Sequence, residues 1–298
     1  MAKLTNYDIA EQYIAEMEIA LAENSVKMYR GVVTAFVASC GAGEPNRAAL
    51  MSWIRSLKKR DVSSNSIRTM ASIVKSFVGW AVANGYYTSD FTHGVKLPSP
   101  EYHVTERMTH DEAKILLNMD APKYTHNVHR NKCMIELALV TATRVSALCA
   151  LKRSDIDLDE KTVTFRHTKR NKELVMPLTD HLCDMLREYI ENIRPVDLTD
   201  DDPLFVGERK DADGRWKPLT RQAVSSITKQ YTQKACGRAL SPHKLRHTSA
   251  SIQIDAGLSI EDICKNLGHS SVGTTQRYAQ KLNDNGRRAA TVAVFENL

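Results

Sequence analysis

The sequence predicts a mainly α-helical protein with a small antiparallel β-sheet, divided into two domains. Apolar residues recur with the 3.6-residue period of an amphipathic helix along most of the 298 residues. The alternation of apolar and polar residues that is typical of strands is confined to two short segments around a basic turn. The length exceeds the usual size of a single core, and a Pro-, Gly- and polar-rich stretch interrupts the periodicity near residue 100. We therefore expect a helical domain over residues 1–97, a linker over 98–105 and an α+β domain over 106–298.

Four helices are expected in the first domain. Asn24 or Ser25 is the candidate N-cap of the second helix, Pro45 precedes the third, and Gly85 closes the fourth. The four expected ranges are 7–22, 25–40, 46–60 and 66–85. Together they predict a small helical bundle.

The second domain is expected to mix helices with a short hairpin. Thr109 and Glu112 have the spacing of a capping box at the start of its first helix. Residues 130–151 form a long apolar periodic segment, which predicts a helix pair or a broken helix. Strands are expected over 161–167 and 173–178, with the basic turn between them. Further helices are expected over 179–193, 220–235, 243–257 and 259–268, and a tail helix over about 287–298.

Composition permits a polyanionic partner and argues against several other classes. The formal net charge of the chain is +6, and its basic residues cluster in the sequence at 56–61, 165–172 and 241–247. Solvated helix faces would also explain these clusters. The candidate contacts to such a polyanion are Lys58, Lys59, Arg60, Arg170, Lys172 and Lys244.

Other features predict a cytoplasmic protein with no membrane partner. No apolar run approaches the roughly 18 residues of a membrane span, and the N-terminus has no apolar signal core. The six cysteines are widely spaced without a CxxC pair, which argues against a disulfide framework and a zinc ribbon. We expect them to be reduced thiols.

Several cationic and hydroxyl-bearing side chains of the second half have no obvious carboxylate partner in the sequence. His243 and Arg246, three residues apart, project from one face of the expected helix and can converge on one ligand. Such a set is poorly suited to a protein core but fits a phosphate site. The candidates, in chain order, are Arg144, Lys169, His243, Arg246, His269 and Tyr278.

Four sequence blocks together resemble the catalytic domain of the tyrosine recombinases, the phage-integrase and Xer-like family. The blocks are TATRVSALCALKRSDID, TKRNKELVMPL, SPHKLRHTSA and LGHSSVGTTQRY. The resemblance covers roughly residues 106–282, and residues 1–97 resemble that family's core-binding domain more weakly. It implies that Arg144 and Arg246 clamp the scissile phosphate, that Lys169 and His243 handle protons, that His269 supports the phosphate and that Tyr278 attacks.

The chemistry requires such groups. Attack on a phosphodiester builds negative charge on the non-bridging oxygens, which the fork of an arginine stabilises. A free tyrosine has a pKa of about 10, so a base must accept its proton as it attacks. The resemblance implies a site-specific recombinase of prokaryotic, phage or mobile-element origin that acts through a 3′-phosphotyrosine and a Holliday junction, without metal, ATP or cofactor. Its partner is double-stranded DNA carrying a specific site.

Alternatives to this interpretation remain. A type IB topoisomerase would use the same phosphotyrosine chemistry, and a non-catalytic DNA-binding regulator could share the fold. His243 and His247 have the spacing of a helical zinc pair with His269 as a third ligand, although Arg246 would crowd a cation. Lys172 competes with Lys169 for the role of acid.

The sequence departs from the family pattern near Arg144. The family usually has an acidic residue where Ala147 stands, and Thr-Gly where the chain has Thr141 and Ala142. These changes put the packing behind Arg144 in doubt, but not the reaction class.

The tail predicts an oligomer. Its apolar residues Val292, Val294 and Phe295 favour a homotetramer on DNA through exchange of C-terminal helices, formed from monomers in solution. Packing of the tail on its own domain is the alternative.

Overall fold

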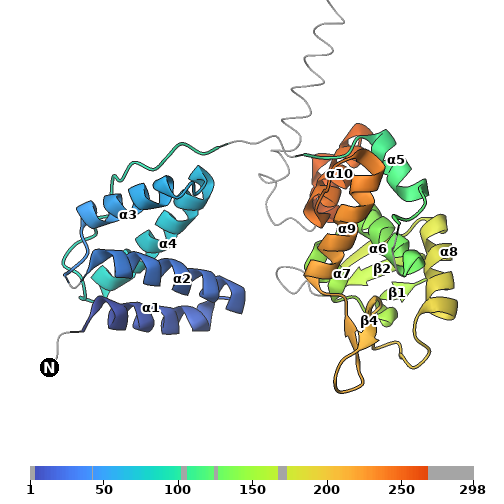
Figure 1. The fold of residues 1–298 in the computed structure, drawn as a ribbon, viewed down its shortest axis with the longest axis horizontal. Coiled ribbons are helices and arrows are strands. Elements are labelled where there is room, and N and C mark those ends of the chain that lie inside the picture. The colour runs from blue at the N-terminus through green and yellow to red at the C-terminus, as the bar shows by residue number, and fades with distance from the viewer. Residues whose placement is uncertain (1–3, 42, 102–105, 124–126, 167–172, 268–298) are drawn as a thin grey trace, which may run out of the picture. The chain divides into compact units, whose positions relative to one another are not determined.

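The structure, a computed structural model, describes residues 4–41, 43–101, 106–123, 127–166 and 173–267. The chain divides into two compact units, residues 1–104 and 105–298 (Figure 1). Helices predominate in both units and the sheets are small and antiparallel, so the predicted fold class is confirmed. In the described ranges, no helix has the length and apolar character that crossing a membrane would require.

The first unit is a bundle of four helices. They are α1 (Asn6–Ala20), α2 (Glu23–Cys40), α3 (Arg47–Lys59) and α4 (Ser64–Ala83). α2 packs against each of the other three, and Phe36 and Phe77 are fully buried between them. A hydrogen bond of 2.9 Å from Tyr13 to the exposed Ser76 joins α1 to α4 at the edge of this core. Hydrophobic burial therefore holds this unit together.

Local capping sets where these helices start. Asn46 caps α3 and Ser63 caps α4 through side-chain oxygens that accept backbone N–H groups. The prediction of Asn24 or Ser25 as the cap of α2 was wrong, because the helix begins earlier, after Ala22. Its first turn instead carries Glu23, which pairs with Lys27 one turn later at 2.6 Å and suits the positive end of the helix dipole.

Part of the expected linker is bonded to α4. Arg68 donates to the carbonyl of Pro98 at 3.1 Å, and Asn65 donates to that of Glu101 at 2.7 Å. The chain from Pro98 to Glu101 therefore follows the N-terminal half of α4.

The second unit is mainly helical. Its elements are α5 (His110–Asn118), α6 (Val128–Thr141), α7 (Val145–Cys149), the short 3-10 helix η1 (Arg153–Asp155), α8 (Asp180–Glu188) with a π turn η2 (Tyr189–Ile193), α9 (Arg221–Cys236), α10 (Pro242–Asp255) and α11 (Ile260–Asn266). The predicted capping box of Thr109 and Glu112 is present at α5. α6 is buried along most of its length and packs against both α8 and α10. It forms the centre of the unit.

The expected broken helix is confirmed. α6 ends at Thr141, and α7 starts again after Arg144. Ala142 between them has φ 50° and ψ 27°, in the left-handed region that L-residues other than glycine seldom occupy. This backbone turn sets the direction in which the chain presents Arg144.

A three-stranded sheet covers part of this core. β1 (Ile156–Asp157), β2 (Thr162–Phe165) and β3 (Leu174–Pro177) lie in the order β1-β2-β3, and Phe165 pairs with Leu174. Val163 and Phe165 point into the core while their neighbours are more exposed, as the alternation predicted. β1 is too short to produce a sequence pattern and was not predicted.

A second hairpin was also not predicted. β4 (Val206–Lys210) and β5 (Trp216–Pro218) pair in antiparallel fashion around a turn that ends at Gly214, where φ is 74°. Both strands are largely exposed, so they lack the alternating apolar pattern on which a strand prediction depends.

Candidate active site

Helix α10 carries two of the candidate residues, His243 and Arg246. Pro242 occupies its first turn, where the missing N–H of proline leaves no bond unmade. The buried side of α10 is unusual because most of it is polar. Its buried residues are Leu245, Arg246, His247, Thr248, Ser249, Ala250 and Ser251.

Arg246 is buried and ties three segments together. Its Nη1 donates to the carbonyl of Ala142 at 2.6 Å, and its Nη2 donates to the carbonyl of Leu267 at 2.5 Å. These carbonyls belong to the C-caps of α6 and α11. Charge-assisted bonds of this kind fix the plane of a guanidinium group. The left-handed turn at Ala142 is therefore part of the arginine's support.

Arg144 stands at the start of α7. It is the N-cap residue, and its carbonyl accepts the N–H groups of Ala147 and Leu148 at 2.9 and 3.0 Å. Its side chain is partly exposed. The backbone of α7 thus anchors a residue that keeps part of its surface accessible to solvent.

His243 is the point on which the positive charges converge. Its ring contacts that of His247 edge-on, with 4.5 Å between the centroids. Although the side chain keeps an exposed surface, the protein lowers the pKa of His243, first through loss of hydration and then through the charges of Arg246, Lys244 and Arg144. The fold therefore brings Arg144, far away in sequence, to the cationic end of α10.

The first residues of the unit also bind α10. The N–H of Met108 donates to the hydroxyl of Thr248 at 3.0 Å, and Arg107 donates to Ser251. Thr248 in turn donates to the carbonyl of Lys244 at 2.9 Å. Thr248 and Ser251 thus have specific partners, which hold the helix against the start of the unit.

The remaining candidates lie elsewhere. Lys244 is partly exposed on α10. Lys58 and Lys59 occupy the last turn of α3 and Arg60 is its C-cap, all exposed in the first unit, where the helix dipole also favours cations. The following candidates lie outside the described residues: Lys169, Arg170, Lys172, His269, Tyr278 and the tail 287–298.

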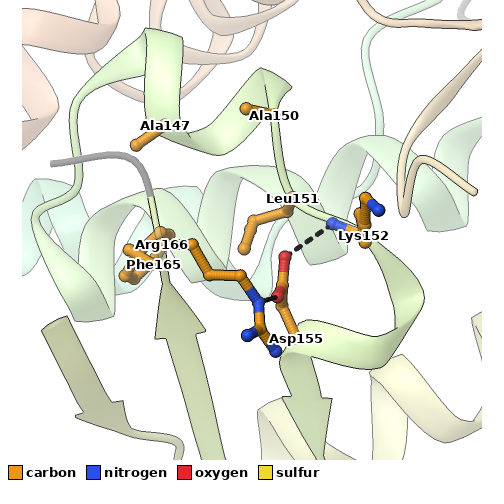
Figure 2. Close-up of a pocket in the computed structure, with 7 residues that line it drawn as sticks. All are labelled: Ala147, Ala150, Leu151, Lys152, Asp155, Phe165 and Arg166. Atoms are coloured by element: carbon orange, nitrogen blue, oxygen red, sulfur yellow. Dashed lines mark hydrogen bonds and ion pairs between the residues drawn. The ribbon is translucent and has the colours of Figure 1, made fainter. Parts of the chain in front are cut away.

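One charged group was missed by the sequence analysis. Arg166, at the end of β2, binds the buried Asp155 with 2.5 Å between Nε and Oδ1. Figure 2 shows this pair beside a cavity of about 30 Å³ that Ala147 also lines. The signal available in the sequence was the position of Arg166 at the base of the basic turn.

The described residues do not bring together three His, Cys, Asp or Glu side chains that could hold a metal ion. The zinc alternative also needs His269, which lies outside the described residues. All six cysteines are free thiols.

Comparison with known proteins identifies the family. The profile of the Phage integrase family matches residues 106–285. The tyrosine recombinase XerC of Roseiflexus sp. (strain RS-1) is 31% identical over 239 residues, which are 77% of this chain and 72% of the relative. The chain belongs to the phage integrase family of site-specific tyrosine recombinases. The predicted family and enzyme class are confirmed.

Other comparisons agree with this recombinase assignment. The tyrosine recombinase XerA of Thermococcus kodakarensis is 27% identical over 266 residues, 89% of this chain and 88% of the relative. The fold resembles the Tn1549 transposon integrase in complex with a circular intermediate DNA, with a TM-score of 0.72, 16% identity and coverage of 92% and 95% of the two chains. It also resembles a lambda integrase dimer bound to a COC′ core site, with a TM-score of 0.69, 17% identity and coverage of 92% and 77%.

Proposed function

We propose that this recombinase cuts and rejoins double-stranded DNA at a specific site, with the cationic group around His243 as the phosphate-binding part of its active site. The supporting observation is the position of Arg246, which lies buried on the same helix as His243 and is bonded to the carbonyl of Ala142, two residues before Arg144. A phosphodiester carries a negative charge, and its transition state carries more, so a fixed cationic site lowers the barrier.

The two arginines serve different parts of this task. Arg246 is buried and held by the carbonyls of Ala142 and Leu267, so its guanidinium does not have to reorganise when the phosphate arrives. Arg144 is partly exposed at the start of α7 and meets the phosphate from the solvent side. Together they stabilise the non-bridging oxygens.

His243 serves as the base for Tyr278. Because its pKa is lowered, the imidazole is neutral near pH 7 and can accept a proton. The Oη of Tyr278 forms a bond to phosphorus, its proton passes to His243, and the bond from phosphorus to the 5′ oxygen breaks. The leaving oxygen takes a proton from Lys169, for which Lys172 is the alternative donor. Rejoining reverses these steps with a different 5′ hydroxyl, through a Holliday junction.

His269 supports the phosphate in this scheme. It follows Leu267 by two residues in the sequence, and the carbonyl of Leu267 is bonded to Arg246. His269 thus comes two residues after a carbonyl group that is bonded to Arg246.

The first unit supplies a second DNA-binding surface. Lys58, Lys59 and Arg60 present adjacent exposed cations at the end of α3, and cations in such positions bind backbone phosphates. Arg170 and Lys172 are proposed as further phosphate contacts. Residues 1–97 then act as a core-binding domain and 98–105 as its linker to the catalytic domain.

Strand exchange requires four subunits around two duplexes. We assign the contact to the tail, with Val292, Val294 and Phe295 docking on a neighbouring subunit, and expect a monomer in the absence of DNA. The lambda integrase structure contains a dimer on DNA, which supports assembly on the substrate. Encoding by a phage or mobile element and a cytoplasmic location complete the proposal.

Trapping of the covalent intermediate tests the proposal. Incubation with a suicide duplex that bears the recombination site is expected to give a protein–DNA adduct at a 3′ phosphate in the presence of EDTA. Tyr278→Phe is expected to abolish the adduct with DNA affinity nearly unchanged, because only one hydroxyl is lost. An adduct that persists in Tyr278→Phe would place the nucleophile elsewhere, and full dependence on a divalent ion would refute the mechanism.

A further inference from the structure

A single arginine links the basic hairpin to the interior of the second unit. Arg166 follows β2, and its Nε lies 2.5 Å from an oxygen of Asp155. The other oxygen of Asp155 accepts the N–H of Lys152 at 2.9 Å (Figure 2). The Asp155 side chain is only 5% exposed, so a carboxylate fixed in the η1 turn holds an arginine whose own side chain is half exposed.

The same guanidinium reaches across the hairpin. Its Nη1 lies 3.5 Å from a carboxylate oxygen of Glu173, the residue before β3. Phe165 pairs with Leu174 in the sheet, so residues 166 and 173 form the next position along the hairpin. Arg166 therefore connects both chain ends of the hairpin tip to Asp155.

Ala147 lies beside the ion pair of Arg166 and Asp155. Ala147, on the helix that starts after Arg144, lines the same small cavity as Arg166 and Asp155. The family pattern has an acidic residue at position 147, and here that carboxylate is missing. Among the residues that line this cavity, Asp155 is the one with a carboxylate, and it comes from η1 rather than from α7.

We propose that Arg166 is a positioning residue, which fixes the base of the β2–β3 hairpin against Asp155 and thereby sets where Lys169 delivers its proton. The inference rests on the proposed function, in which Lys169 protonates the leaving 5′ oxygen. Lys169 is three residues from Arg166 along the chain. Proton transfer requires hydrogen-bond distance, so loss of the anchor lowers the rate without removing the acid itself.

The test compares cleavage of two suicide substrates, one with the natural 5′-bridging oxygen and one with sulfur, a leaving group that needs no proton. Arg166→Ala is expected to slow cleavage of the oxygen substrate on the order of tenfold, and that of the sulfur substrate less than about twofold. Lys169→Ala should show the same selective defect, but larger. In the Lys169→Ala background, the Arg166 substitution should cause no further loss on the oxygen substrate.

Further variants separate positioning from stability. Arg166→Gln keeps a donor for Asp155 and should show a smaller defect than Arg166→Ala, which also covers the case in which the alanine variant folds poorly. Arg187→Ala is the control, because it removes another arginine of this unit from a surface pair with Asp184. It should leave both substrates unaffected.

Two results would overturn the inference, and they can be told apart. In the first, Arg166→Ala or Arg166→Gln slows cleavage of both substrates equally, while the sulfur substrate still rescues Lys169→Ala. Arg166 would then have only a structural role. In the second, the sulfur substrate fails to rescue Lys169→Ala. Lys169 would then not be the general acid, and the proposed path of the proton to the leaving oxygen would be wrong.

Discussion

Helices α4 and α10 each bury seven residues, but with opposite chemistry. The buried residues of α4 are all apolar and pack in the core of the first unit, where Val74, Phe77 and Val78 are inaccessible to solvent. Five of the seven on α10 are polar, and the bonds of Arg246 and Thr248 reach the ends of α6 and α11 and the start of the unit. Apolar burial is non-directional, whereas each buried polar group needs a particular partner. α4 therefore stabilises its unit, while α10 holds side chains in a fixed geometry.

The largest effect is expected from Arg246→Ala on α10. Removing this charge-assisted donor should slow cleavage of a suicide substrate on the order of 10² to 10⁴-fold. Arg246→Lys, the matched control, keeps a charge but cannot span the carbonyls of Ala142 and Leu267, so most of the loss should remain. A nearly wild-type rate in either variant would show that α10 only packs, as α4 does.

Phe77→Ala on α4 should act on stability instead. Truncating this fully buried ring should lower the free energy of unfolding of the first unit by about 3–5 kcal/mol. Trp53 and Trp80 both belong to this unit, so tryptophan fluorescence during urea unfolding reports the change. The cleavage rate at saturating DNA under stabilising conditions should change little. A loss of rate comparable to that of Arg246→Ala would contradict the distinction between a stabilising α4 and a positioning α10.

Thr248→Val tests the polar burial of α10 directly. The substitution keeps the shape but leaves the N–H of Met108 without its acceptor, which should lower the free energy of unfolding by about 1–3 kcal/mol. Thr69→Val on α4 is the matched control, because the Thr69 hydroxyl is exposed and donates only to the carbonyl of Asn65 within its own helix. Equal effects of the two substitutions in chemical denaturation would contradict the comparison.

The pH dependence of cleavage should reflect the lowered pKa of His243. As the proposed base, His243 must be neutral, so the cleavage rate should fall only as the pH drops below 6.5, the ordinary pKa of a histidine. The same group binds its proton more readily in the unfolded chain, so its contribution destabilises the fold as the pH falls from 6.5 through the lowered pKa. Arg144→Ala removes one positive charge and should move the acid limb to higher pH, whereas Arg187→Ala should not. If the acid limb of the pH–rate profile does not move in Arg144→Ala, the charge of Arg144 does not act on His243.

The smallest effects concern the two helix ends. α4 is followed by Gly85 with φ 73°, and a Cβ added there would meet no atom within 4 Å, so Gly85→Ala should cost about 1 kcal/mol through backbone strain alone. Ala142→Gly relieves strain at φ 50° but removes a buried methyl group, so the two effects should nearly cancel, leaving a net change under about 1 kcal/mol. Thermal unfolding of both variants measures this. A large loss in Ala142→Gly would mean that the methyl group, rather than the turn, supports Arg246.

The contrast between α4 and α10 also explains what the sequence could predict. α4 follows from periodicity and from Gly85, because local pattern and tertiary burial agree there. The start of α2 was misplaced because its N-cap is Ala22, whose side chain cannot accept a backbone N–H, so no capping residue marks this position in the sequence. β1 has two residues and β4 is mostly exposed, so neither leaves a pattern.

The candidate site was accessible to sequence reasoning through spacing and resemblance rather than periodicity. His243 and Arg246 are local on one helix, so their spacing places them together. The partners of Arg246 are backbone carbonyls, which no side-chain pattern reveals. Arg166 was missed for a related reason, because its partner Asp155 lies 11 residues earlier in η1, a 3-10 helix of three residues that is too short to leave a sequence pattern.

The two bonds of Arg246 also determine when a functional site can exist. They close separations of 104 and 21 residues along the chain, and the bond from Met108 to Thr248 closes one of 140 residues. Long loops lose more entropy on closure than short ones, so such contacts form only after local elements have collapsed. A chain still leaving the ribosome without residue 267 lacks one of the two carbonyls that hold the guanidinium. The proposed phosphate-binding geometry therefore forms only after residue 267 has been synthesised and the unit has folded, and shorter nascent chains carry the charges without the site.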